Sequence, residues 1–476
     1  MLESLDPKYK LIFTIVPTTL LALTFLWSAH SQVGSPYPSD YIFITVSFVA
    51  VLFAYLITII KNPFNFFDSI HLYTAFYLLI FFVTPLVLIN LGQTTCFGVY
   101  IMGSAKKTTF IVAIGLVSYY IGYSTSKPSI NLQLRPQTPK TTDRRRILII
   151  SYFYFLAVSL LNIYVLLSAG KSVSYILTLG GGTYEKQEGL TSGMRFIINF
   201  CYTTIVPWLV ICFYSRLKII KIVISYLIFA IFFAYGWRFI TYIMAISFFI
   251  VYFRFYNKTP KVTHIASLFV GLLLFSVVLG SVRSNIRRGE KANFDGFSIQ
   301  NIGFTLESNF NIYQSFYAIV DNYPQNYNHT YGQATLVYPV IMWIPRFIWP
   351  EKPLGKDYPI SQATINSINS FAIEDAGFAT PNIGEYYLDF GIPGVIIFFF
   401  VIGYASKYML WFYYSDSFFD LIIYAVFCGF LIQFINRGYI AQSLTLSVFL
   451  FGPLLLYRKY YKAEIKLITL VKKYIN

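Results

Sequence analysis

The sequence predicts an all-α polytopic integral membrane protein that crosses the bilayer about twelve times. Of its 476 residues, 57% are hydrophobic and 12% are charged, whereas an average soluble domain is about 25% charged. Apolar runs of about 20 residues, the length that spans the hydrocarbon core of a bilayer, recur from one end of the chain to the other. Basic residues are concentrated in alternate loops, and this bias indicates which loops face the cytoplasm.

The connections between the apolar runs are short, apart from one long stretch. We therefore divide the chain into a transmembrane bundle (1–281), a large external loop (282–391), three C-terminal spans (392–458) and a basic cytoplasmic tail (459–476). The predicted spans are 11–29, 41–60, 71–91, 109–126, 147–168, 196–215, 219–236, 239–256, 265–281, 392–411, 421–436 and 443–458.

The formal net charge of +16 indicates orientation rather than a nucleic-acid partner. With both termini in the cytoplasm, the cytosolic side holds 22 of the 36 lysines and arginines but only 7 of the 20 acidic residues. This is the positive-inside asymmetry of membrane proteins. We expect a multi-pass protein of a cytoplasmic membrane and no nucleic acid.

The long external loop is predicted to carry short helices. Apolar residues at alternating intervals of four and three form a helical stripe there: Ile302, Leu306, Phe310, Tyr313, Tyr317 and Val320. The apolar run 336–349 contains Pro339 and Pro345 and is too short to cross a bilayer. An interfacial or re-entrant segment fits this run best.

Several familiar chemistries are absent from the sequence. It contains no Asp-x-Asp, the usual motif for a metal-bound nucleotide sugar, and the four cysteines lack metal-ligand spacing. Gly170-Lys171-Ser172 resembles the end of a P-loop, but Val165 stands where that motif needs glycine. The predicted spans carry no Asp or Glu, which argues against an ion-coupled pump.

Arginines near the external ends of spans are the candidate substrate-binding groups. A guanidinium group matches phosphate oxygens with two parallel hydrogen bonds, so a ring of them suits a lipid pyrophosphate. The alternative is that each arginine reaches lipid headgroups. The set is Arg195, Arg238, Arg283, Arg287, Arg288, Arg346 and Arg437.

His329, Glu385 and Asp389 are the candidate catalytic residues, because each offers a base near the arginines. The alternatives are a solvated histidine, and carboxylates that cap a helix or pair with arginine. Trp349, Tyr386 and Tyr387 are candidates for stacking on sugars. An interfacial aromatic belt is the alternative for the tryptophan.

Two stretches resemble a known family. Ile344-Pro345-Arg346-Phe347-Ile348-Trp349-Pro350-Glu351-Lys352-Pro353 is similar to the Pro-Arg…Trp-Pro-x-Lys-Pro signature of bacterial O-antigen and capsule repeat-unit polymerases, the Wzy family. Gly384-Glu385-Tyr386-Tyr387-Leu388-Asp389-Phe390-Gly391-Ile392-Pro393-Gly394 resembles the Glu-Tyr…Phe-Gly-x-x-Gly segment that leads these proteins into a late span. The Gly236-Trp237-Arg238 turn resembles their short Gly-x-Arg hairpin.

The resemblance implies a GT-C-like membrane glycosyltransferase of the bacterial inner membrane. Such a protein transfers a growing glycan from undecaprenyl pyrophosphate to the next lipid-linked repeat unit on the outer face, with no metal or other cofactor. Its partners would be lipid-linked oligosaccharide repeat units, membrane lipids and a chain-length regulator protein. The resemblance implies pyrophosphate binding by Arg238, Arg283, Arg346 and Arg437. Lys352, in the motif, is a further candidate for pyrophosphate binding.

Two other functions share this topology. An O-antigen ligase uses the same donor and delivers the glycan to lipid A-core, and only the signature around Arg346 favours the polymerase. A lipid-linked oligosaccharide flippase has a similar number of spans, but it needs a polar path through the bundle and has little use for a long external loop.

Overall fold

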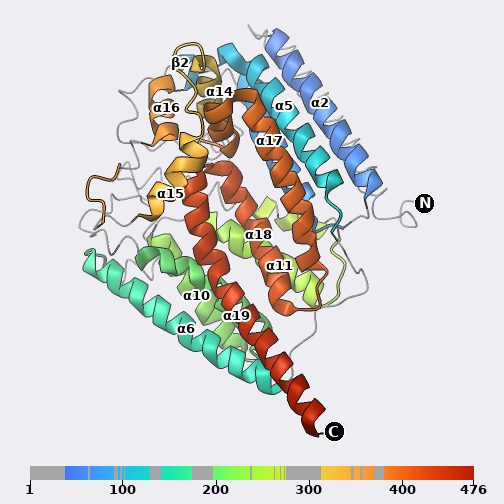
Figure 1. Cartoon of the computed structure of the whole chain (residues 1–476), viewed down its shortest axis with the longest axis vertical. Coiled ribbons are helices and arrows are strands. Elements are labelled where there is room, and N and C mark those ends of the chain that lie inside the picture. The colour runs from blue at the N-terminus through green and yellow to red at the C-terminus, as the bar shows by residue number, and fades with distance from the viewer. Residues whose placement is uncertain are drawn as a thin grey trace. The chain divides into compact units, whose positions relative to one another are not determined.

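The computed structural model describes most of the chain as helices (Figure 1). The predicted first span, 11–29, lies outside the described residues, as do the motif arginines Arg238, Arg283 and Arg346. The described residues are 38–62, 65–90, 95–96, 99–100, 102–128, 141–173, 194, 197–235, 239–261, 263–268, 270–272, 274, 312–344, 348–353, 358–368 and 380–475.

Seven of the described helices are long and apolar enough to cross a membrane, and shorter apolar helices accompany them. The predicted all-α polytopic architecture is thereby confirmed. Within the described residues the strands are one antiparallel pair of two residues each, β1 (Thr95–Cys96) and β2 (Val99–Tyr100). The seven helices cover Ser39–Lys61, Ser69–Ile89, Ala105–Thr125, Arg144–Ser168, Asn382–Tyr413, Phe418–Asn436 and Ile440–Arg458.

The chain divides into two compact units, and three late helices contribute residues to both. Unit 1 takes its described residues from Met1–Pro128, Gly296–Met409 and Leu431–Ser443. Unit 2 takes its described residues from Ser129–Asp295, Leu410–Phe430 and Leu444–Asn476. The three shared helices are α17 (Asn382–Tyr413), α18 (Phe418–Asn436) and α19 (Ile440–Ile475).

Unit 1 contains helical elements besides its parts of α17, α18 and α19. They are α2 (Pro38–Lys61), α3 (Ser69–Leu78), the π-helical turn η2 (Leu79–Val83), α4 (Thr84–Asn90), the 3-10 turn η3 (Met102–Ser104), α5 (Ala105–Thr125), α14 (Ile312–Asn322), the π-helical turn η6 (Gln333–Val337), α15 (Tyr338–Trp343) and α16 (Pro359–Ile368). In Figure 1, α2 runs alongside α5.

Unit 2 packs its shorter helices against a long one, α6, as Figure 1 shows for α6 and α10. Its elements are α6 (Thr141–Ser168), the 3-10 turn η5 (Asn199–Thr204), α9 (Ile205–Tyr214), α10 (Lys218–Ala234) and α11 (Phe239–Phe255).

The core of unit 1 combines aromatic stacking with direct backbone contact. Tyr73 and Tyr119 stack with ring centroids 4.3 Å apart. A Cβ atom added at Gly403 would lie 2.0 Å from the carbonyl oxygen of Tyr119, and one at Gly122 would lie 2.0 Å from that of Phe400. Helices α5 and α17 therefore meet backbone to backbone, as small residues permit in membrane bundles.

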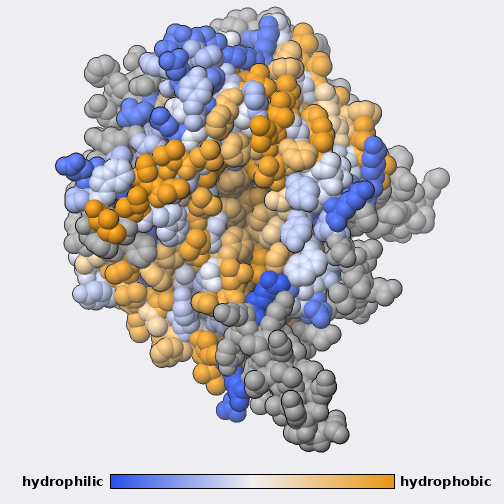
Figure 2. All heavy atoms as spheres, viewed as in Figure 1, coloured by the Kyte–Doolittle hydropathy of each residue, from blue (hydrophilic) through white to orange (hydrophobic). Residues whose placement is uncertain are grey.

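The outward faces of the long helices are apolar, which is the reverse of a soluble protein. Phe153 and Leu156 of α6 and Phe53 of α2 are exposed, and Figure 2 shows hydrophobic residues over much of the visible surface. Such faces are stable where hydrocarbon, not water, surrounds the helix.

Helix α17 begins ten residues before the predicted span start at 392. Gly391, with φ 63° and ψ −148°, interrupts it, so the predicted boundary corresponds to this break. The segment Asn382–Gly391, here called the α17 N-terminal segment, is helical up to that glycine instead of belonging to a loop. Helix α19 likewise continues to Ile475, through most of the predicted tail.

These longer bounds change one argument from the sequence. The predicted spans contained no carboxylates, but the observed helices include three buried ones, Glu385 and Asp389 on α17 and Asp420 on α18. Each is engaged in the contacts described below, so the absence of carboxylates no longer argues against transport. Of the predicted loop stripe, Tyr313, Tyr317 and Val320 lie buried on α14, and its first three members lie outside the described residues.

Candidate functional site

The α17 N-terminal segment is the point where four separate parts of unit 1 meet. Asn382 follows Pro381, a sequence typical of a helix start. Its side-chain oxygen accepts hydrogen bonds from the backbone N–H of Ile383 at 3.0 Å and from the hydroxyl of Tyr77 on α3. Gly438, in the turn between α18 and α19, donates its N–H to the carbonyl of Thr380 at 2.9 Å.

The close contact between the α18–α19 turn and the start of α17 requires glycine at position 438. A Cβ atom at this position would lie 1.9 Å from the backbone nitrogen of Asn382, so any larger residue would push the turn away from α17. The turn carries Arg437, which is exposed.

Asp389 anchors a second element to the same segment. Its carboxylate is fully buried and accepts four hydrogen bonds. The donors are the Thr330 hydroxyl, the Ala334 N–H at 3.1 Å, and the N–H and hydroxyl of Thr335 at 2.7 and 2.6 Å. The first N–H groups of a helix lack partners within that helix, and here a carboxylate from another helix supplies them.

The helix that Asp389 caps leads into the signature motif. It begins with η6 at Gln333 and ends with α15 at Trp343. An anionic cap is favourable at this end of a helix because the macrodipole is positive there. Asp389 therefore fixes where the segment carrying Arg346 starts. A carboxylate occupied by four donors is poorly placed to accept a further proton.

Glu385, one turn earlier on α17, also caps the start of another helix. Its Oε2 accepts the N–H of Ile440, the first residue of α19, at 2.8 Å, and the side chain is buried. The charge of Glu385 also acts on Tyr439: burial raises the pKa of the Tyr439 hydroxyl, the Arg437 charge opposes this rise and the Glu385 charge adds to it. Glu385 therefore holds the turn that presents Arg437.

His329 lies beside the α17 N-terminal segment, and one hydrogen bond orients its ring. Its Nδ1 lies 3.1 Å from the carbonyl oxygen of Leu388. A carbonyl can only accept, so Nδ1 carries the hydrogen and Nε2 of the neutral ring keeps a free lone pair. Within the described residues Nε2 has no hydrogen-bond partner, and it lies 3.3 Å from the position of a Cβ on Gly391. The half-buried ring meets Tyr387 edge-on, with centroids 5.7 Å apart.

Lys352 binds backbone carbonyls of residues that precede it by eight and ten positions. Its Nζ donates to the carbonyl oxygens of Met342 at 2.7 Å and Ile344 at 3.0 Å. These carbonyls lie at the C-terminal end of α15, where a cation is favourable. The ammonium thus ties the two ends of the stretch that contains Arg346, instead of pointing freely into solvent.

The aromatic candidates separate into two groups. Tyr386 is 1% exposed and stacks on Phe398 with centroids 4.5 Å apart. Tyr387 is 2% exposed, and its hydroxyl donates to the carbonyl of Tyr323 at 2.9 Å. Both rings are packed inside unit 1 and offer no free face to a sugar. Trp349 is 38% exposed and does offer one.

The structure thus brings Glu385, Asp389, His329 and Arg437 to one helix segment, and Lys352 binds the C-terminal end of the helix that Asp389 caps. Sequence reasoning missed Tyr77, Thr330, Thr335, Asn382 and Tyr439, which complete the arrangement. Only Asn382, after Pro381, carried a helix-start signal. The others are ordinary tyrosines and threonines whose role depends on a distant contact.

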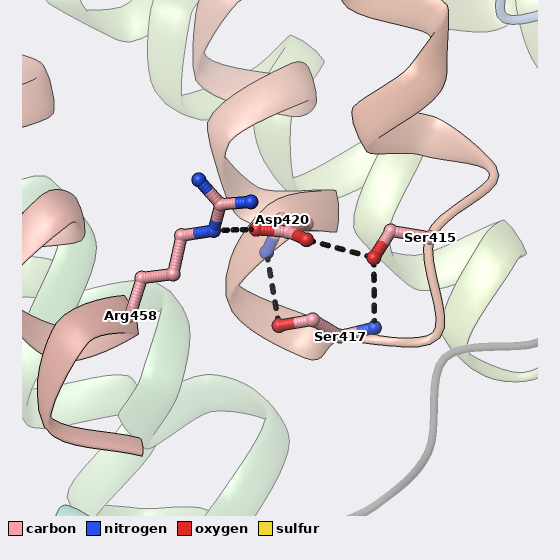
Figure 3. A network of polar contacts seen from close by, with 4 residues as sticks. All are labelled: Ser415, Ser417, Asp420 and Arg458. Atoms are coloured by element: carbon pink, nitrogen blue, oxygen red, sulfur yellow. Dashed lines mark hydrogen bonds and ion pairs between the residues drawn. The ribbon is translucent and has the colours of Figure 1, made fainter. Parts of the chain in front are cut away.

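A second buried carboxylate cluster lies in unit 2 and is structural (Figure 3). Asp420 pairs with Arg458 Nε at 2.6 Å and accepts from the Ser415 hydroxyl at 2.7 Å. Ser417 caps the start of α18 by accepting the Asp420 N–H at 3.4 Å. The Arg458 guanidinium also lies over the Trp411 ring, 5.6 Å from its centroid. Every group in this cluster has a protein partner.

Among the residues that the structure describes, no three His, Cys, Asp or Glu side chains gather as metal ligands would. Independence from metals stays a prediction.

The fold defines a class: a polytopic membrane protein in which a short helix and a turn with an exposed arginine are attached to the start of a late helix. A comparison with protein families matches residues 11–464 to the family described as O-antigen polysaccharide polymerase Wzy. The chain therefore belongs to this family, as the motif resemblance predicted, and an O-antigen polymerase role follows in general terms. No curated protein and no solved structure matches the chain.

Proposed function

We propose that this protein is a glycosyltransferase that polymerises undecaprenyl-pyrophosphate-linked repeat units on the outer face of the cytoplasmic membrane. The observation that carries the proposal is the pair of carboxylate caps, Glu385 and Asp389, on one helix segment. Through them the Arg437 turn and the helix that precedes Arg346 in the sequence are attached to α17 one helical turn apart. Family membership supports the same reaction.

His329 is the general base in this scheme. Its Nε2 takes the proton from a hydroxyl of the acceptor sugar as that oxygen bonds to the anomeric carbon of the growing glycan. The bond between the anomeric carbon and the pyrophosphate oxygen breaks, and undecaprenyl pyrophosphate leaves with the electron pair. The reaction needs no ATP, because the pyrophosphate linkage supplies the driving force.

Fixed positive charge stabilises the departing pyrophosphate. We assign this role to Arg346 and Arg437, together with Arg238 and Arg283 from the sequence resemblance. No metal or other cofactor takes part in the scheme. Lys352 acts on the segment rather than on the substrate, since its ammonium is bound to two carbonyls. Trp349 is the proposed sugar-stacking residue, and a chain-length regulator is the expected protein partner.

Glu385 and Asp389 are positioning residues in this proposal. Asp389 accepts two backbone N–H groups of the helix Gln333–Trp343, and Glu385 accepts one backbone N–H of α19. The sequence offered catalysis and helix capping as alternatives for these residues, and the contacts favour capping.

The test is a surface-glycan ladder from cells in which the gene is deleted and then restored on a plasmid. We expect the deletion to leave a single-repeat band and no ladder, because flipping and ligation continue. Arg346→Ala and His329→Gln should fail to restore the ladder, and Arg346→Lys should restore it poorly because an ammonium lacks the planar fork. Membrane levels of each variant are measured in parallel.

Two outcomes would replace the proposal. Long chains that accumulate on undecaprenyl pyrophosphate without reaching the surface would indicate the ligase. Single repeats trapped on the cytosolic leaflet would indicate the flippase. An unchanged ladder in the deletion strain would contradict all three functions.

A further inference from the structure

Elements η6 and α15 form one short amphipathic helix, Gln333–Trp343. One face of it is apolar and uncovered. Leu336 is 59% exposed and Val340 is 67% exposed. Val337 and Trp343 are exposed beside them, and Ile348 extends the surface past the helix end. Positions 336, 340 and 343 follow the four-three spacing of a single helical face. These five side chains are called the α15 face below.

The opposite face of the same helix is firmly attached to unit 1. Ala334, Thr335 and Pro339 are buried. Asp389 binds the first turn as described above, and the ring of Tyr338 meets that of Tyr358 edge-on at 4.8 Å. The helix therefore cannot rotate to hide its apolar residues without breaking these contacts.

The helix is too short to cross a bilayer. Eleven residues at 1.5 Å per residue extend about 16 Å, about half of the hydrocarbon thickness. Both of its ends are already capped by side chains, Asp389 at the start and Lys352 at the end. With its terminal N–H and C=O groups so satisfied, the helix meets the condition for contact with lipid without spanning it.

The α15 face is continuous with an exposed apolar surface of α17. Gly332 lies between the two: a Cβ added there would be 3.1 Å from Cζ of Phe390 and 3.2 Å from Cδ1 of Leu336. Phe390 is itself exposed, and Ile396 and Ile397 follow it on the exposed face of this span. Figure 2 shows the hydrophobic residues over α15 as a band on the molecular surface.

We propose that the α15 face lies in one leaflet of the bilayer, in contact with lipid acyl chains beside α17. Helix α15 is then an interfacial helix of the kind that rests in the boundary between headgroups and acyl chains. Trp343 suits this boundary, where tryptophan is enriched. The inference does not depend on the polymerase function.

The test measures lipid contact residue by residue in the full chain. In a variant with Cys96, Cys201, Cys212 and Cys428 replaced by alanine, single cysteines are introduced as Leu336→Cys and Val340→Cys and labelled with the fluorophore NBD. Ile397→Cys on the exposed face of α17 is the matched control for lipid contact. Asn328→Cys, exposed in the loop before η6, is the control for water contact. The proteins are placed in phosphatidylcholine–phosphatidylglycerol nanodiscs, with or without a doxyl spin label on the acyl chains.

We expect NBD at positions 336 and 340 to emit at shorter wavelength and to be quenched by the doxyl lipids as strongly as at position 397. NBD at position 328 should be quenched by iodide in water instead. Iodide quenching at 336 and 340 would overturn the proposal. Protection of both positions from doxyl lipid and from iodide would also overturn it, because a protein, such as a second copy of this chain, would then cover the face.

Folding is checked for each labelled variant by a single elution peak and an unchanged unfolding temperature. Should one of the two positions fail this check, Trp343→Cys provides a third site on the same face. The result at any two of the three positions decides the proposal.

Discussion

The carboxylate of Asp389 on α17 accepts both hydrogen bonds that Thr335 can donate, from its N–H at 2.7 Å and from its hydroxyl at 2.6 Å. The two residues are 54 positions apart in the chain. Their contact joins the start of a membrane-spanning helix to the short helix that leads into the Trp-Pro-Glu-Lys-Pro motif. It decides where the motif lies relative to α17.

This contact predicts a graded series of variants. Thr335→Val removes only the hydroxyl and should cost about 1 kcal/mol. Asp389→Ala leaves buried N–H groups without partners, at about 1–3 kcal/mol each, and should abolish the surface-glycan ladder. The free energy of unfolding is measured in detergent and the ladder on a gel. Asp416→Asn, at an exposed aspartate, is the control. Full chain growth in Asp389→Ala would show that the cap is dispensable.

Two substitutions of Glu385 separate its hydrogen bond to the start of α19 from the effect of its negative charge. Glu385→Gln keeps a carbonyl oxygen for the N–H of Ile440 but removes the negative charge, whereas Glu385→Ala removes both. If capping is the main role, the Gln variant should retain most of the ladder and the Ala variant should lose it. Equal loss in both would instead show that the carboxylate charge beside Arg437 is required. Ladder density per unit of membrane protein is the measurement.

The backbone contact between α5 and α17 predicts a strict requirement for glycine. Gly403→Val would place side-chain atoms where the Tyr119 carbonyl lies, and overpacking costs about 1–3 kcal/mol even where neighbours can move. We expect this variant to lose its single elution peak in detergent. Gly452→Ala is the matched control, because a Cβ there meets nothing within 4 Å. This control should be stable or slightly more stable, since alanine favours helix over glycine by about 1 kcal/mol.

The ion pair between Asp420 and Arg458 lies outside the candidate site. Its loss should lower the free energy of unfolding without removing a group that is proposed to contact substrate. Arg458→Met leaves a buried carboxylate unpaired, which costs about 3–5 kcal/mol. The double variant Asp420→Asn with Arg458→Met should recover part of that loss. A thermal unfolding series of the wild type, both single variants and the double variant gives the coupling energy. Additive losses would mean that the two side chains act independently.

The parts of the fold that depend on local pattern could be predicted from the sequence. Helix α2 (Pro38–Lys61) agrees with the predicted span 41–60, and α18 (Phe418–Asn436) with 421–436. Hydropathy determines such helices because a run of about 20 apolar residues is stable only inside a bilayer. The start of α17 differed, because Asn382–Phe390 is too polar to count as a span. It is helical because its polar groups bind neighbouring elements.

The candidate site shows a similar division. The sequence selected His329, Glu385, Asp389 and Arg437 by residue type, and the structure places all four at the α17 N-terminal segment. The sequence could not distinguish a carboxylate that accepts a substrate proton from one that caps a helix. That distinction depends on which N–H groups lie within about 3 Å, and those of Thr335 and Ile440 come from distant parts of the chain.

Tyr386 and Tyr387 illustrate the same limit. Adjacent tyrosines in a motif suggest a sugar platform, yet both rings are buried in packing. The sequence alone determined the lipid environment, the apolar cores of helices such as α2 and α18, and the family of this protein. Hydropathy and a contiguous motif are properties of neighbouring residues. The tertiary structure alone decided which polar side chains are free to react, since burial and hydrogen-bond partners arise only when distant residues meet.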